Sequence, residues 1–151
     1  MKRVALLATA LLALACGGEP QTPEERVRAT LAALEAAAEA RDVAAMKEHV
    51  SETYRDERGN DRRAVSALVA LHFQQNRSVH LLVRTLAIAV DPPAATASVL
   101  VAMAGTPIES ADALPLVHAD FHRFDFELRE EDGTWRIAAA AWRPANAADF
   151  R

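Results

Sequence analysis

Residues 116–142 read LVHADFHRFDFELREEDGTWRIAAAAW, and this stretch decides the fold. Its first half, residues 116–128, alternates between two sets of side chains and is expected to form a strand. Residues 135–142 are expected to form another strand, and EDGT at 131–134 joins the two with the Asp-Gly dipeptide that favours a tight hairpin turn. The stretch therefore predicts an antiparallel hairpin around which the rest of the chain packs.

Three helices are predicted before the hairpin. Thr22 opens the sequence TPEE, in which threonine can cap, proline fits the first turn and glutamate can close a capping box. The apolar stripe that follows predicts a helix that ends near Arg41. Asp42 and Asp61 can cap a second and a third helix, and residues 51–60 between them predict a loop or a short strand. The inward stripes are Val27, Leu31, Leu34 and Ala38 in the first helix, and Val65, Leu68, Val69, Leu71, His72 and Phe73 in the third.

Two further strands are predicted between the third helix and the hairpin. Residues 78–90 are rich in leucine and β-branched residues, and residues 94–104 place apolar side chains from Val99 to Met103 on one side. The sequence DPP at 91–93 separates them as a turn, because proline cannot donate a hydrogen bond to a strand ladder. Three helices followed by about four antiparallel strands predict an α+β domain, a curved sheet with helices packed on one face.

The chain begins with the features of an export signal. Lys2 and Arg3 precede a wholly apolar or small stretch over 4–15, which leads to Cys16, the single cysteine of the chain. This stretch is too short to cross a hydrocarbon core, which needs about 20 residues. The segment LALAC at 12–16 resembles the bacterial lipobox, in which a signal peptidase cuts before the cysteine and the thiol receives a diacylglycerol. The resemblance implies that Cys16 is lipidated and anchors the protein in a membrane.

The predicted cleavage divides the chain into a signal peptide over 1–15, a lipidated cysteine with a tether over 16–21, and one domain over 22–151. By resemblance to Gram-negative lipoproteins, Gly17 favours the periplasmic face of the outer membrane. Cleavage removes two of the 17 basic residues, and the remaining 15 stand against 21 acidic ones, a net charge of −6. This charge makes nucleic acid an unfavourable partner.

Five features in order carry a family resemblance. They are the Thr-Pro-Glu helix start, Arg41-Asp42-Val43 between the first two helices, Asp56 followed by Gly59 before the third, Asp120-Phe121-His122-Arg123-Phe124 on a strand, and the closing Asp-Gly-Thr-Trp-Arg-Ile hairpin. Over about 22–142 the chain resembles the nuclear transport factor 2-like superfamily, the cystatin-like cone shared with ketosteroid isomerases and polyketide cyclases. This fold hosts enzymes, binding proteins and scaffolds, so the resemblance implies an architecture more than an activity.

The resemblance also has consequences for catalysis. In ketosteroid isomerases an aspartate after the second helix shuttles the proton, and a tyrosine on the first helix joins a protonated strand aspartate as the oxyanion hole. The resemblance places Asp56 near the base position and Asp120 at the strand aspartate, through the shared Asp-x-x-Arg-Phe spacing. The tyrosine position falls at about Ala33, so that donor is missing and a steroid-isomerase mechanism is disfavoured.

Strand parity places His118, Asp120 and His122 on the same face as Phe124 and Phe126. The apolar end of this face is expected to point into the cone, and the triplet to approach its mouth. Same-face neighbours lie about 6.6–6.8 Å apart, so Asp120 could orient a histidine base for hydrolysis or proton abstraction. The alternatives are polar residues at a solvated strand end, which we favour, and a metal site on His118 and His122, for which no third ligand is evident.

Other polar residues are candidates for a pocket. Tyr54 and Asp56 lie in the loop expected to rim the cone, although Asp56 can equally hydrogen-bond the turn toward Gly59. His80 begins a strand and His72 lies on a helix stripe, and both also fit histidines at the edge of a core. No Gly-rich phosphate loop, serine elbow or paired-cysteine motif occurs in the sequence, so no cofactor is predicted. The predicted ligand-binding residues are Tyr54, His80, Asp120 and His122.

Three functions fit these observations. The favoured one is a lipid-anchored periplasmic domain that binds a small apolar ligand or a protein partner without catalysis. The second is an enzyme, a hydrolase or an isomerase-like proton-transfer catalyst, that uses the aspartate–histidine triplet and Asp56. The third is a homodimeric interaction module, in which an outer sheet face with Val117, Phe121 and Trp142 pairs with a second copy. Strand parity puts Trp142 on this outer face and Trp135 on the other.

Overall fold

The structure is a computed structural model that describes residues 21–151. The predicted signal peptide and Cys16 lie outside the described residues. The elements, in chain order, are α1 (Pro23–Glu39), α2 (Val43–Glu48), α3 (Arg62–Gln75), β1 (His80–Asp91), β2 (Ala94–Ala104), the 3₁₀ helix η1 (Ala111–Leu116), β3 (Ala119–Glu131), β4 (Thr134–Pro144) and the 3₁₀ helix η2 (Ala147–Phe150).

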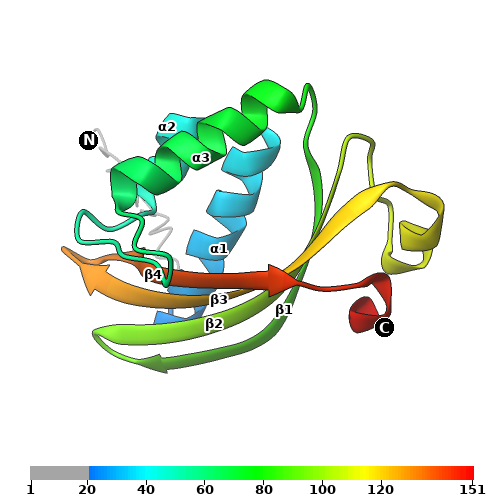
Figure 1. Cartoon of the computed structure of the whole chain (residues 1–151). Coiled ribbons are helices and arrows are strands. Elements are labelled where there is room, and N and C mark those ends of the chain that lie inside the picture. Colours follow the sequence, from blue (N-terminus) through cyan, green and yellow to red (C-terminus); the bar gives the residue numbers. More distant parts are fainter. Residues whose placement is uncertain (1–20) are drawn as a thin grey trace, which may run out of the picture.

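The three α-helices lie on one side of a sheet that curves around them (Figure 1). The strands follow one another in the order β1-β2-β3-β4, and each is antiparallel to its neighbours. The predicted hairpin is formed by β3 and β4, and its turn residues Asp132 and Gly133 both have positive φ, as the tight turns favoured by Asp-Gly require. The predicted α+β class, with helices on one face of a curved antiparallel sheet, is confirmed.

Each α-helix begins at the predicted capping residue. The Thr22 side chain accepts a hydrogen bond from the Glu25 N–H, and the Glu25 carboxylate accepts one from the Thr22 N–H, which completes the capping box. Asp42 and Asp61 accept the third N–H of α2 and α3 in the same way. Within residues 21–151, none of the helices is long and apolar enough to cross a membrane.

The alternation of side chains along β4 shifts at a β-bulge. Ala139 and Ile137 pair with consecutive residues of β3, so Ala138 is the extra residue on β4. The bulge shifts the side-chain alternation by one position, and Trp142 therefore lies on the concave face together with Ile137. The prediction that Trp142 lies on the outer face is wrong, because strand parity assumes an unbroken ladder.

The main core lies between α1 and the part of the sheet next to the β3–β4 turn. Val27 of α1 packs there against Leu128, Trp135 and Ile137 from the hairpin. Trp135 is 1% exposed and is among the largest fully buried side chains of residues 21–151. The Thr30 hydroxyl donates to the Trp135 carbonyl at 3.4 Å, which ties α1 to the start of β4. The apolar end of the hairpin thus builds the core, as the sequence predicts.

A second apolar cluster covers part of the convex face of the sheet. Leu100 and Ala102 of β2 pack there against Leu114 of η1 and Phe150 of η2. Phe121 joins this cluster, and its ring centroid lies 6.0 Å from that of Phe150 in an edge-to-face arrangement. The segment after β4 therefore folds back over the convex face.

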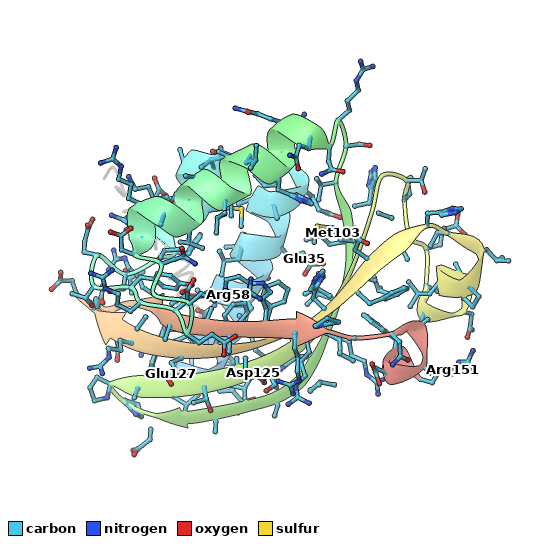
Figure 2. The ribbon with its side chains drawn as sticks, viewed as in Figure 1. Glu35, Arg58, Met103, Asp125, Glu127 and Arg151 are labelled. Carbon is cyan, nitrogen blue, oxygen red and sulfur yellow. The ribbon has the colours of Figure 1, made fainter. Side chains whose placement is uncertain are left out.

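The predicted dimer surface is not a single face of the molecule. Phe121 and Val117 pack into the convex cluster, whereas Trp142 lies on the concave face. Farther along the convex side the surface is charged, and Figure 2 shows Asp125 there, on the side of the sheet away from the helices. Hydrogen bonds from Ser98, Arg143 and Arg123 outweigh burial and lower the pKa of Asp125. A homodimer itself stays a prediction.

Candidate functional site

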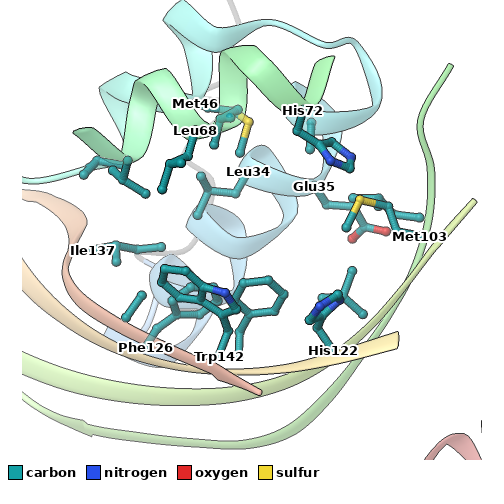
Figure 3. Close-up of a pocket in the computed structure, with 18 of the residues that line it drawn as sticks. Leu34, Glu35, Met46, Leu68, His72, Met103, His122, Phe126, Ile137 and Trp142 are labelled. Carbon is teal, nitrogen blue, oxygen red and sulfur yellow. The ribbon is translucent and has the colours of Figure 1, made fainter. Parts of the chain in front are cut away.

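A cavity of about 490 Å³ lies between the helices and the concave face of the sheet. Its volume falls within the range of about 300–1,000 Å³ that is typical of small-molecule sites. Leu34 of α1 and Leu68 of α3 form one wall, and Phe126, Ile137 and Trp142 of the sheet form the opposite wall (Figure 3). The cone is therefore hollow, and most of its lining is apolar.

The position of α3 leaves this space open. The sequence predicts a buried face on α3, but Phe73 is the one residue of this helix that is buried. Leu68 lines the cavity and is still 48% exposed, and Leu71, at 49% exposed, does not line it. The apolar stripe of α3 thus faces empty space rather than tightly packed sheet side chains, and the prediction that Leu71 is buried is wrong.

Four polar lining residues gather at one end of the cavity, whereas Lys47, Tyr54 and Ser66 line it elsewhere. Figure 3 shows Glu35, His72, Met103 and His122 at this end, away from Ile137. Strand register adds Asp120, because Asp120 pairs with Met103 across β2 and β3. We call Glu35, His72, Asp120 and His122 the polar end of the cavity.

Glu35 is a polar-end residue that the sequence analysis missed. It lies on α1 and is partly buried, and burial together with the nearby Glu39 raises the pKa of its carboxyl group. Within residues 21–151, no hydrogen bond or ion pair involves its carboxylate. A signal was present in the sequence, because Glu35 follows Leu31 by four residues and therefore interrupts the apolar stripe of α1 on its inward face.

His122 and Asp120 both line the cavity, but His118 does not. β3 begins at Ala119, so His118 precedes the strand, is exposed, and does not share the face with the other two. The Nδ1 atom of His122 is buried without a hydrogen-bond partner, and its ring lies 6.1 Å from that of Phe124. The structure thus brings two members of the predicted triplet to the cavity, and strand parity failed for the third because the strand starts after it.

Asp56 lies beside the cavity wall rather than in the cavity. Its carboxylate accepts hydrogen bonds from the N–H groups of Arg58 and Asn60 and from the Asn60 side chain, and its own carbonyl accepts from the Gly59 N–H. Burial raises the pKa of this carboxyl group, but hydrogen bonds from Asn60, Arg58 and Tyr54 outweigh burial and lower it. Asp56 therefore holds the loop before α3, and the structure does not place it among the lining residues.

Replacing Asp56 with asparagine is expected to lower the free energy of unfolding at pH 7 by about 1–3 kcal/mol, because the Asn60 amide would face a donor in place of an acceptor. A folded-state pKa below the unfolded value stabilises the protein above the unfolded pKa of about 3.9, and this contribution is lost as the pH falls through the folded value. The difference between wild type and Asp56→Asn should thus shrink below about pH 4 in urea unfolding. A pH-independent difference, or an equal loss in Glu57→Gln at the exposed neighbouring residue, would contradict this role.

Tyr54 lines the cavity, whereas His80 does not. Tyr54 is 3% exposed, and burial followed by the charge of Asp56 raises the pKa of its hydroxyl. His80 is the first residue of β1, and its neighbour Leu81 is the residue that faces the cavity. Strand alternation thus points His80 away from the space that it was predicted to line.

The loop that carries Asp56 also contacts the sheet wall of the cavity, through Arg58. The Arg58 guanidinium lies 4.4 Å from the centre of the Trp142 ring, a distance at which a cation and an aromatic face attract one another. No group of three or more histidine, cysteine, aspartate or glutamate side chains within residues 21–151 is arranged to hold a metal ion.

Comparison with known proteins identifies the fold. No protein-family model matches the chain, and no curated protein matches it. Among solved structures, a Streptomyces avermitilis protein provisionally named a dehydratase of the nuclear transport factor 2-like family is 13% identical, with a TM-score of 0.65 over 83% of this chain and 99% of that one. A Pseudomonas putida nuclear transport factor 2-like protein of unknown function is 14% identical, with a TM-score of 0.63 over 85% and 91%.

A third similar structure is named after a domain of a protein kinase. A Thiobacillus denitrificans protein, provisionally named a calcium/calmodulin-dependent protein kinase type II association domain, is 19% identical, with a TM-score of 0.63 over 83% of this chain and 96% of that one. The chain thus has the nuclear transport factor 2-like fold, as its sequence motifs predict. At these identities the likeness concerns the fold alone.

Proposed function

We infer that the chain is a domain that binds a small, largely apolar molecule in the cavity between its helices and its sheet. The cavity itself carries this proposal, because a folded chain of this size normally fills its interior to close-packed density. A hollow lined by leucine, valine and aromatic side chains offers a ligand the free energy of removing apolar surface from water, about 25 cal/mol per Å².

A proton-transfer enzyme is the second candidate, and its support is narrower. A histidine that acts as a general base is commonly oriented by a hydrogen bond from its second ring nitrogen to a partner. Asp120 and His122 both line the cavity, but within residues 21–151 no hydrogen bond joins them. The apolar lining is therefore the stronger observation, and it favours binding.

Binding can be tested with the neutral fluorescent probe N-phenyl-1-naphthylamine and the full chain carrying Cys16→Ala. The probe's fluorescence should rise on addition of the protein and saturate at one site per chain, because the cavity would remove the probe from water. Unlabelled apolar compounds should displace it. A linear, unsaturable rise would indicate nonspecific partition and would overturn the proposal.

We propose further that this domain is held at the periplasmic face of the outer membrane by lipid on Cys16, as the lipobox-like segment at 12–16 suggests. Each buried CH₂ group of an attached acyl chain contributes about 0.8 kcal/mol to membrane binding, so more than one chain gives a lasting anchor. Cys16→Ala is expected to move the protein from the membrane fraction to the soluble periplasmic fraction. Continued sedimentation with membranes in the variant would refute the anchor.

A further inference from the structure

We propose that the cavity binds an amphiphile with a cationic, hydrogen-bond-donating head, such as a long-chain amine, whose head lies between Glu35 and His122 and whose tail points toward Trp142. This inference rests on the proposed function, because it names the class of ligand for the same cavity. Four observations support it: the polarity of the cavity, its unpartnered polar atoms, its charge, and the environment of Glu35.

The carboxylates and imidazoles of the cavity lie at one end, and the rest of the lining is apolar apart from Lys47, Tyr54 and Ser66. Figure 3 shows Glu35, His72 and His122 at one end, and Ile137 and Trp142 toward the other. A purely apolar ligand would leave the carboxylate and the imidazoles facing a hydrocarbon surface, which costs free energy for each unpaired group. A molecule with one polar end matches this division.

Two partly buried groups at the polar end lack the partners that such groups normally have. The Nδ1 atom of His122 is buried without a hydrogen bond, and the Glu35 carboxylate has no hydrogen-bonded or charged partner within residues 21–151. In folded proteins the great majority of buried polar atoms are hydrogen-bonded, so the buried nitrogen of His122 calls for a water or a ligand, and the partly buried Glu35 carboxylate is free to share it. An ammonium head has three N–H donors and can serve both a carboxylate and an unprotonated imidazole nitrogen.

The charge of the lining favours a cation at this end. Glu35 and Asp120 supply two carboxylates, and Lys47 is the one lysine or arginine among the described residues that line the cavity. Lys47 lies at the far end, because its carbonyl accepts a hydrogen bond from Arg62, at the start of α3. His72 is ten residues farther along this helix, a distance of about 15 Å.

Arg41 does not neutralise the negative charge at the polar end. Arg41 is outside the lining, and its guanidinium donates to the carbonyl oxygens of Phe73 and Arg77 at the end of α3. These contacts occupy the guanidinium with backbone oxygens. The lining groups at the polar end are therefore two carboxylates and two imidazoles, and the Glu39 carboxylate, outside the lining, adds negative charge close to Glu35.

The environment of Glu35 makes a cation more favourable than another polar head. Burial and Glu39 raise the pKa of Glu35, which means that the ionised carboxylate is disfavoured in the empty cavity. An ammonium group placed beside it would stabilise the ionised form, whereas a carboxylate head would add a further negative charge beside Glu35, Glu39 and Asp120. An alcohol of equal length should fall between the two.

The test compares decylamine, 1-decanol and decanoate by isothermal titration calorimetry, below the concentrations at which they form micelles, on the full chain carrying Cys16→Ala. Decylamine should bind more tightly than decanoate by about ten- to a hundredfold, the effect of a hydrogen bond to a charged group. Glu35→Gln should reduce this preference to within about threefold and leave the affinity for 1-decanol nearly unchanged.

Glu109→Gln is the matched control, because it removes the same charge from an exposed position outside the cavity. It should keep the preference for decylamine. Decanoate binding as tightly as decylamine, or a preference that survives Glu35→Gln, would overturn the proposed head-group site while leaving the cavity as an apolar binding site. If none of the three compounds binds while N-phenyl-1-naphthylamine binds saturably, this inference fails and the apolar site stands; if the probe does not bind saturably either, the proposed function fails as well.

Discussion

Replacing Trp135 with alanine is expected to lower the free energy of unfolding by about 3–5 kcal/mol. The indole is 1% exposed and packs against Val27 and Leu128, so its removal would leave a cavity that these residues cannot fill. Whole domains are stable by about 5–15 kcal/mol, so the variant should be near the limit of folding. Its urea unfolding midpoint, measured by circular dichroism, would report the loss.

The matched control is Trp142→Ala, on the same strand. Trp142 borders the empty cavity, and its principal aromatic and cationic contacts are Phe124 and Arg58. Aromatic and cation–π pairs of this kind contribute about 0.5–1.5 and 0.5–1 kcal/mol, so this variant should lose about 1–2.5 kcal/mol. Equal losses in the two variants would mean that Trp142 is as much a core residue as Trp135.

Replacing Leu34 with tryptophan is expected to weaken the binding of any cavity ligand at least about a hundredfold, or about 2.7 kcal/mol. Leu34 projects from α1 into the middle of the cavity (Figure 3), so an indole at this position would occupy the volume that the ligand needs. Because the added ring enters empty space, the free energy of unfolding should fall by less than about 1 kcal/mol or should rise. Probe binding and urea unfolding on the same preparation would measure both quantities.

Ala32→Trp provides the control for this experiment. Ala32 is exposed on α1, two residues from Leu34, and does not line the cavity. The same large side chain at this position should leave the affinity unchanged within about twofold. Loss of binding in both variants would point to a disturbed helix rather than a filled cavity.

The fold could be predicted because its determinants are local. Caps at Thr22, Asp42 and Asp61 start three helices through contacts within a few residues, and Asp132-Gly133 sets the hairpin turn. Each of these signals depends on a short segment and on no distant partner. The order of the elements then left few arrangements for a chain with alternating strands and amphipathic helices.

The site could be predicted only in part, because its composition depends on distant contacts. The extra residue at Ala138 reverses the direction of Trp142, and neither residue carries a local signature of a bulge. Glu35 was missed because a glutamate on a helix usually faces water, although its position four residues after Leu31 places it on the inward stripe that lines the cavity. Whether α3 packs against the sheet or stands away from it is likewise set by the tertiary structure.

The bulge in β4 also makes the wall of this binding space tolerant of a change in chain length. Residues outside the sheet hold the bulge in place. The Ala138 carbonyl accepts a hydrogen bond from the Arg55 N–H, the Ile137 carbonyl accepts one from the Ser51 N–H, and the Ile137 N–H donates to the His49 carbonyl. Deleting the extra residue would leave a regular ladder in which Ala139 still pairs with Glu127 and Trp142 with Phe124, so the indole would stay in the cavity wall. A single-codon deletion here would therefore cost the hydrogen bond from Arg55 and leave the composition of the wall unchanged.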